Sequence, residues 1–201
     1  MNYHSEKLVK DISAKAQSFR MKVLEMVHGG QTGHIGGAFS IAEVLASLYF
    51  HHLRIDPKNP SWPERDRLLF SKGHACAMLY TNLAHRGFFP VDELMTFRKL
   101  NSRLQGHPDP IKTPGVEVAA GPLGHGICIG TGMALALRTQ SGIKPSAQSA
   151  PSAMASEAKV YVICGDGEIN SGVIWEGVME AAKFRVGNLT VILDYNGIQQ
   201  C

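Results

Sequence analysis

Two short apolar runs near the end of the chain give the clearest structural signal in the sequence. They cover residues 160–164 and 189–194, are rich in branched side chains, and are almost unbroken by polar residues. Strands buried on both faces of a parallel sheet have this pattern. Between the runs, Val173, Val178 and Ala181 recur at helical spacing. The segment therefore predicts a strand–helix–strand unit, and the expected fold class is α/β, a mostly parallel sheet with helices on both faces.

Nearer the N-terminus, the apolar residues follow a helical period. Residues 5–28 are predicted to form the first helix, which a pair of glycines ends. The next stretch, 33–37, is glycine-rich and is expected to be a loop. A capping-box pattern that begins at Ser40 predicts a second helix to about residue 50. Further elements are expected as helices at 75–86, 91–100 and 127–137, and as a short strand at 66–70.

Residues 141–157 differ from the rest of the chain in composition. Ser, Ala, Pro and Gln dominate this stretch, which has no apolar face to bury. We interpret it as a surface insertion into the fold, because a strand pattern resumes directly after it. Residues 1–201 are then expected to form a single domain.

Composition excludes several classes of protein. The chain has 201 residues, of which 44% are hydrophobic and 18% charged, and these values are typical of a globular domain with a real core. The net charge of +3 is too small to indicate a nucleic-acid partner. The sequence contains no leader pattern and no apolar run of membrane-spanning length, so no membrane association is predicted and a cytoplasmic protein is expected.

Polar residues follow both apolar runs at the point where each predicted strand ends. Asp166 stands between Gly165 and Gly167 after the first run, and Asn196 follows the second. Ligands of open parallel sheets bind outside these strand ends. Carboxylate and amide oxygens suit Mg²⁺, and glycines allow backbone to approach a phosphate. Each motif alone is better explained as an ordinary turn, but the two together favour a metal–phosphate site.

Three histidines lie in turns beside glycine, namely His34, His74 and His107. On the residues alone, His34 and His107 are better explained as surface-turn histidines, while helix capping and anion binding are equally good explanations of His74. A glycine-rich turn at 121–126 precedes the helix predicted at 127–137. This turn has a weak similarity to a dinucleotide-binding loop, but no convincing strand precedes it.

Taken together, these motifs resemble the transketolase family. Gly165-Asp166-Gly167 followed by Asn196 is similar to the thiamine-diphosphate motif of that family. The resemblance implies a thiamine-diphosphate-binding fold in which Asp166, Asn196 and the backbone carbonyl of Ile198 bind Mg²⁺, or Ca²⁺ or Mn²⁺ in its place. It also implies that Gly167 meets the cofactor's diphosphate.

Four other blocks match the family in the same order along the chain. They are Gly33–Gly37, Ser71–Ala75, 106–117 and 121–126. The resemblance implies roles for their residues: substrate contact by His34 and His107, diphosphate contact by His74, and packing against the aminopyrimidine ring by Gly121, Pro122 and Leu123. The three histidines are the candidate catalytic residues, and they can titrate near neutral pH.

The implied activity is transfer of a two-carbon ketol unit from a ketose or ketose phosphate donor to an aldose acceptor. The blocks are most similar to the N-terminal, diphosphate-binding subunit of a split transketolase. This resemblance implies sugar phosphates as substrates and, for a partner, the C-terminal pyrimidine-binding subunit. Deoxyxylulose phosphate synthases share the outline but match residues 106–117 less well. A non-catalytic fragment that only pairs with a partner is the third possibility.

The sequence departs from the family pattern at two points. Ser171 stands where many relatives have a Glu that is thought to link paired active sites. The chain also stops soon after the metal motif, before the expected end of the family's domain. Coupling between active sites is therefore in doubt, and the glutamate that activates the cofactor is expected on another chain or segment.

The helix after Gly172 carries more apolar surface than one sheet face can bury, on Val173, Ile174, Trp175, Val178 and Met179. Such surface commonly marks an interface. We therefore expect self-association through this helix, in a dimer or heterotetramer. Burial of the helix inside a monomer is the alternative.

Overall fold

The computed structural model describes residues 5–140 and 158–197. The predicted insertion at 141–157 and the candidate metal ligand Ile198 lie outside these residues. The helices are α1 (Glu6–Gly30), α2 (Ile35–Ser40), α3 (Ala42–Ser47), α4 (Cys76–Arg86), α5 (His125–Gln140) and α6 (Gly172–Lys183), with shorter helical turns η1 (Leu48–His52), η2 (Gly73–Ala75), η3 (Val91–Thr96) and η4 (Asp166–Asn170). The strands are β1 (Arg67–Phe70), β2 (Val160–Gly165) and β3 (Leu189–Asp194).

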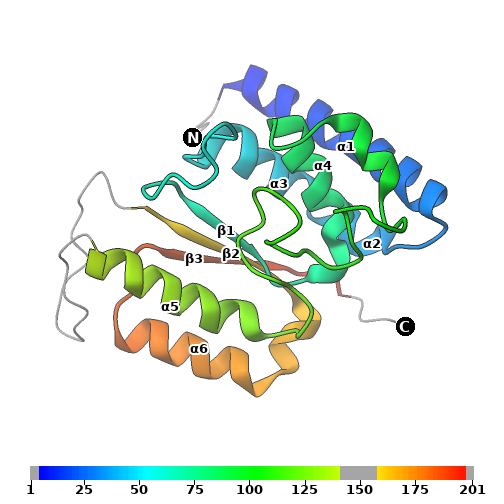
Figure 1. Ribbon diagram of the computed structural model, residues 1–201. Helices are drawn as coiled ribbons and strands as arrows, with labels where there is room; N and C mark the ends of the chain where they lie inside the picture. Colours follow the sequence, from blue (N-terminus) through cyan, green and yellow to red (C-terminus); the bar gives the residue numbers. More distant parts are fainter. Residues whose placement is uncertain (1–4, 141–157, 198–201) are drawn as a thin grey trace.

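The strands of the described residues form one parallel sheet in the order β1-β2-β3. Leu69 pairs with Val162, and Val162 pairs in turn with Val191. Figure 1 shows α1, α3 and α4 over one face of the sheet and α5 and α6 over the other. The α/β prediction, with a parallel sheet and helices on both faces, is therefore confirmed.

Successive strand residues point to opposite faces and enter two separate apolar clusters. Leu68, Phe70 and Ile163 pack with the buried residues of α1, α3 and α4. Leu69 and Val162 pack on the other face with α5 and α6. Both faces of β2 are covered, as its apolar run predicts, and β1 confirms the short strand expected at 66–70.

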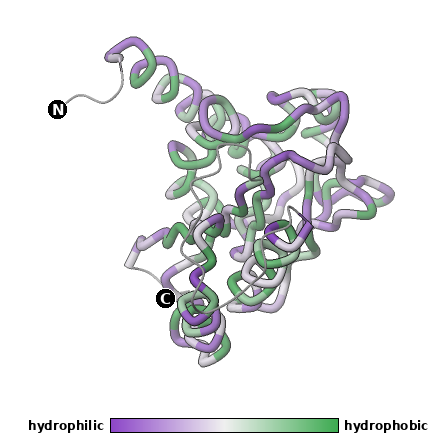
Figure 2. Tube along the Cα trace, turned by 90° about the vertical axis from the view of Figure 1, so that its left-hand side faces the viewer, coloured by the Kyte–Doolittle hydropathy of each residue, from purple (hydrophilic) through white to green (hydrophobic). Residues whose placement is uncertain are grey.

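Helix α1 begins where its sequence indicates, but it continues through the two glycines predicted to end it. The Ser5 side chain caps it by accepting a 3.2 Å hydrogen bond from the Leu8 amide. Gln31 ends it in a left-handed conformation, with φ at 51°. Figure 2 shows hydrophilic and hydrophobic residues alternating along its turns, as in a helix with one buried stripe. No helix in the described part of the chain is both long and apolar enough to span a membrane.

Two predictions between α1 and β1 are wrong. The expected loop at 33–37 is already helical from Ile35, because α2 begins there. Ser40 does not cap a helix; it ends α2, and its hydroxyl bonds the Gly37 carbonyl at 3.2 Å and Asp194 at 2.5 Å. Tertiary contacts thus replace the local capping that the spacing suggested.

Two other expectations also need correction. The helix predicted at 91–100 is the short 3₁₀ turn η3, and left-handed conformations at Arg98 and Asn101 prevent its continuation. Strand β3 is not buried on both faces, since Val191 and Leu193 remain 41% and 44% exposed. Among the described strands, only β2 pairs with it.

Candidate active site

The carboxyl ends of the three strands open into a cavity of about 720 Å³, within the usual size range of small-molecule sites. Its walls come from segments far apart in the sequence: the start of α2, the turn after β1, the loop before α5 and the ends of β2 and β3. The residues that line it are His34, Ile35, Gly36, Gly37, Lys72, His74, His107, Gly121, Leu123, Gly165, Asp166, Gly167, Glu168 and Asn196.

The three candidate histidines all line this cavity. His34 is the residue before α2, and His74 lies in η2; their ring centroids are 5.4 Å apart. His107 approaches from the loop before α5, where a Cβ at Gly73 would lie 3.0 Å from its Cδ2 atom. Glycine at position 73 therefore keeps His107 close to the turn that carries His74.

Burial lowers the pKa of His74, and the nearby positive charges of Lys72 and His34 lower it further. Near neutral pH its ring is then predominantly neutral, with one nitrogen as donor and the other as acceptor. His74 can thus donate a hydrogen bond to an anion without itself carrying a full positive charge.

Asp166 begins η4 directly after β2, and its carboxylate organises the two glycine turns around it. Oδ1 accepts a 3.1 Å hydrogen bond from the Gly167 amide, and Oδ2 accepts a 2.8 Å bond from the Gly197 amide. The second bond joins the end of β3 to the end of β2. It places the backbone around Asn196 beside Asp166 at the cavity.

This donor set fits a hard divalent cation. A carboxylate has about four acceptor positions, so Asp166 keeps capacity for a metal beside its two amide bonds. Asn196 adds an amide oxygen, and Mg²⁺ commonly takes few protein ligands and completes its shell with phosphate oxygens. No group of three or more acidic, histidine or cysteine ligands occurs among the described residues. A site that relies on a ligand's phosphates is consistent with that finding.

Glu168 also lines the cavity, although sequence reasoning gave it no role. It is 3% exposed. Its carboxylate accepts hydrogen bonds from the Ser71 hydroxyl at 2.5 Å, the Gly124 amide at 2.8 Å and the Gly165 amide at 2.7 Å. Glu168 thereby joins the turn after β1, the loop before α5 and the end of β2.

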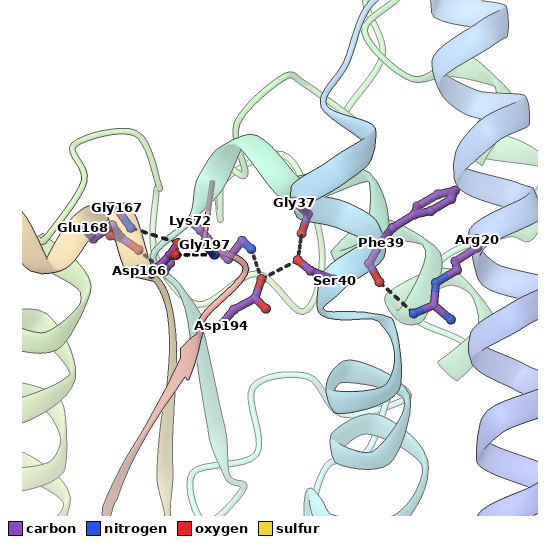
Figure 3. Close-up of polar contacts among 11 residues, drawn as sticks. Arg20, Gly37, Phe39, Ser40, Lys72, Asp166, Gly167, Glu168, Asp194 and Gly197 are labelled. Carbon is purple, nitrogen blue, oxygen red and sulfur yellow. Dashed lines mark hydrogen bonds and ion pairs between the residues drawn. The ribbon is translucent and has the colours of Figure 1, made fainter. Parts of the chain in front are cut away.

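Lys72 is the second residue without a predicted role. It lines the cavity, is 1% exposed, and forms an ion pair with Asp194 at the end of β3. Figure 3 shows Lys72 and Ser40 reaching Asp194 from opposite sides. A charged residue between an apolar strand and a glycine was the available sequence signal, but its partner lies far away in the chain.

The turn before α5 supplies Gly121 and Leu123 to the cavity wall. Pro122 lies between them but is not among the lining residues that the structure describes. A Cβ at Gly126 would lie 2.4 Å from the Ser71 Cβ, so only glycine allows this close approach. Packing against the turn after β1 therefore explains the glycine at position 126, whereas a Cβ at Gly124 would lie 3.0 Å from Val173 of α6.

Fold and cavity together define an α/β protein with a cavity, the candidate ligand site, at the carboxyl edge of a parallel sheet. The model of one family, described as "Transketolase, thiamine diphosphate binding domain", matches residues 12–200. The chain belongs to this family, and the resemblance noted from its motifs is confirmed.

Two relatives illustrate the similarity. The chain is 41% identical over 189 residues to a 6-deoxy-6-sulfo-D-fructose transketolase subunit of Clostridium sp. (strain MSTE9). It is 39% identical over 190 residues to an apulose-4-phosphate transketolase subunit of Actinobacillus succinogenes. Each match covers 94% of this chain and 64% of the relative, so the chain spans less than two thirds of these curated proteins.

Solved transketolases have the same fold. The transketolase of Leishmania mexicana superposes with a TM-score of 0.83 at 35% identity, covering 94% of this chain and 28% of that one. The Campylobacter jejuni enzyme gives a TM-score of 0.82 at 36% identity, with the same coverage. The chain thus corresponds to about a quarter of these longer enzymes.

Proposed function

We propose that this chain is the diphosphate-binding part of a transketolase that moves a two-carbon ketol unit from a ketose or ketose phosphate to an aldose. The observation that carries the proposal is the single cavity that brings Asp166 and Asn196 together with His34, His74 and His107. A module that served only for pairing would have no need of this polar set at one sheet edge.

Asp166, Asn196 and the carbonyl of Ile198 would hold Mg²⁺, or Ca²⁺ or Mn²⁺ in its place. Gly167 and His74 would meet the diphosphate, since the turn exposes backbone and the neutral His74 ring can donate. Thiamine diphosphate, when bound, supplies the reactive carbon that carries the two-carbon unit. The protein contributes orientation, electrostatics and proton transfer around it.

His34 and His107 are the proposed contacts to substrate. Both side chains are exposed at the cavity, where they can reach sugar hydroxyls and act as hydrogen-bond donors or acceptors. Gly121, Pro122 and Leu123 would pack against the aminopyrimidine ring. The relatives' names refer to a sulfo sugar and a sugar phosphate, which supports a ketose with an anionic end as substrate.

A pyrimidine-binding partner subunit is part of the proposal. Two relatives are named as subunits, and the cavity has no described residue assigned to activate the pyrimidine ring. Helix α6 also exposes Trp175, Val178 and Met179, at 55%, 39% and 64%. These residues are suited to an interface between copies of the chain, in a dimer or a heterotetramer with the partner.

The test is calorimetric titration of the full protein, with its partner subunit, with thiamine diphosphate in the presence of Mg²⁺. Asp166→Ala should remove metal-dependent binding, because Asp166 supplies the one carboxylate of the proposed ligand set. Asp56→Ala is the matched control, since this exposed carboxylate accepts only a local bond from the Lys58 amide. Unchanged affinity in Asp166→Ala would contradict the proposal.

A further inference from the structure

We propose that Lys72, acting through Asp194, is a positioning residue that holds the end of β3 so that Asn196 faces the metal site. The inference rests on the proposed function, because it gives Asn196 a metal to bind. Lys72 follows Ser71 in the turn after β1, and its ammonium pairs with Asp194 across the cavity edge. Both side chains are largely buried, with exposures of 1% and 10%.

Asp194 is the last residue of β3 and stands two positions before Asn196. The same carboxylate oxygen that pairs with Lys72 accepts a 2.5 Å hydrogen bond from the Ser40 hydroxyl. Ser40 ends α2, the short helix that begins directly after His34. Two separate elements, the turn after β1 and α2, therefore hold the strand end through one carboxylate (Figure 3).

The segment that carries Asn196 is fixed at both ends. Lys72 and Ser40 hold it at Asp194, and at Gly197 the backbone amide donates a 2.8 Å hydrogen bond to Asp166. Strand β3 has only β2 as a pairing partner among the described strands. Without the ties to Asp194, the end of β3 would depend on backbone pairing with β2 and on the single bond between Gly197 and Asp166.

Stability does not explain this ion pair. Buried ion pairs are often no more stabilising than apolar residues of the same shape, because desolvation offsets the attraction between the charges. Removal of one partner, however, leaves an uncompensated buried charge. Lys72 lies in the cavity wall, and its partner Asp194 stands just before the turn that carries Asn196. We therefore explain the ion pair by its effect on the position of that turn.

Direct contact between Lys72 and the cofactor is the competing explanation. A Cβ at Gly37 would lie 3.1 Å from the His74 Nε2 atom and 3.7 Å from the Lys72 Nζ atom, so the lysine is close to the diphosphate-binding histidine. Ser40 separates the two explanations. It holds the same Asp194 oxygen but is not among the described residues that line the cavity.

The experiment compares four variants of the full protein with its partner subunit: Lys72→Met, Ser40→Ala, the double variant Lys72→Met/Asp194→Leu, and Ser18→Ala as control. Ser18 is an exposed serine of α1 whose hydroxyl bonds only its own helix, at the Lys15 carbonyl. The first readout is hydrogen exchange of the Gly197 amide without ligands. The second is Mn²⁺ affinity, by electron paramagnetic resonance, at saturating thiamine diphosphate.

We expect faster Gly197 exchange in Lys72→Met and, to a smaller degree, in Ser40→Ala. Mn²⁺ affinity should fall roughly 10-fold or more in Lys72→Met, as for other residues that orient metal ligands. Loss of the single Ser40 hydrogen bond should weaken it about 2- to 5-fold. The double variant, which leaves no buried charge unpaired, should regain a wild-type melting temperature but not metal affinity.

Three results would overturn the inference. They are unchanged Gly197 exchange in both single variants, unchanged Mn²⁺ affinity in Ser40→Ala while Lys72→Met weakens cofactor binding, and recovery of metal affinity in the double variant. If Lys72→Met does not fold, the Ser40→Ala and double variants still distinguish a positioning role from direct contact with the cofactor. If the wild-type protein binds neither metal nor cofactor, the proposed function fails, whereas the exchange measurement still tests the tie to Asp194.

Discussion

The two faces of the sheet are similarly apolar in sequence but differ in how completely they are covered. On the α1–α4 face, residues such as Phe70 and Ile163 are 3% and 0% exposed. On the α5–α6 face, Leu69 and Val162 are both 0% exposed, but Val191, which pairs with Val162, is 41% exposed. The same residue type in the same sheet is core at one strand and surface at the next.

The difference shows that coverage by other elements, and not side-chain type, decides which apolar residues form the core. Helices α5 and α6 cover β1, β2 and the start of β3 but leave Val191 and Leu193 exposed, and α6 itself exposes Trp175 and Met179. Contiguous exposed apolar surface usually marks a site of contact. The α1–α4 face is therefore the self-sufficient part of the chain, and the β3–α6 surface is the part suited to association.

The largest expected effect comes from making the same substitution, leucine to alanine, at two strand positions. Leu69→Ala in β1 should lower the free energy of unfolding by about 3 kcal/mol, because it leaves a cavity in a closed core. Leu193→Ala in β3 should lower it by less than about 1 kcal/mol, since this side chain is 44% exposed. Chemical denaturation of the purified chain measures both values. Equal losses would mean that the β3 face is covered in solution.

Much of this architecture could be predicted from local patterns. Unbroken apolar runs predict the strands β2 and β3, and a glycine predicts the end of α4 at Gly87. Asp166 and Asn196 could be placed at one edge because parallel strands share a carboxyl edge. These inferences need only periodicity and the rule that adjacent parallel strands end together.

The errors arise where distant contacts determine the local structure. Nothing near Ser40 in the sequence indicates that its hydroxyl bonds Asp194, so a capping role seemed reasonable. The partners of Lys72 and Glu168 are likewise remote. The exposure of β3 depends on which elements lie beside it, and a strand's own sequence contains no information on its neighbours.

A second prediction concerns the cavity at the carboxyl edge of the sheet, where the two faces meet. Glu168→Gln should lower the free energy of unfolding by about 2 kcal/mol, since one of three donors would face an amide NH₂ in place of a charged oxygen. Glu117→Gln is a suitable control, because this carboxylate bonds one arginine, Arg65, away from the cavity. Thermal unfolding compares the two. A larger loss at Glu117 would contradict the central role given to Glu168.

A smaller effect on the fold, but a clear one on assembly, is expected at α6. Trp175→Glu places a charge on the exposed apolar surface and should shift the protein toward smaller species in sedimentation velocity. Its melting temperature should change little, since Trp175 is 55% exposed and makes one hydrogen bond, from Nε1 to the Ile169 carbonyl. Leu100→Glu, at an exposed position between η3 and α5, is the control. Unchanged association in Trp175→Glu would place the interface elsewhere.

The smallest predicted effect compares two histidines, one at the cavity and one on the α1–α4 side. The pKa of His74 is lowered by burial, Lys72 and His34, and that of His85 by desolvation, Lys15 and Lys22. For each, the unfolded chain takes up a proton first as pH falls below about 6.5. Stability should therefore decline from that pH down to the lower folded pKa, and neither histidine should affect it above that range.

Cofactor binding should separate the two histidines. A diphosphate anion beside His74 stabilises the protonated ring and raises its pKa toward the unfolded value. The pH-dependent loss of stability due to His74 should then shrink when metal and thiamine diphosphate are bound, while the loss due to His85 should stay the same. Thermal unfolding between about pH 5 and 8, with His74→Gln and His85→Gln as references, measures the change. If the ligands altered the His85 contribution and left that of His74 unchanged, the diphosphate would not lie beside His74.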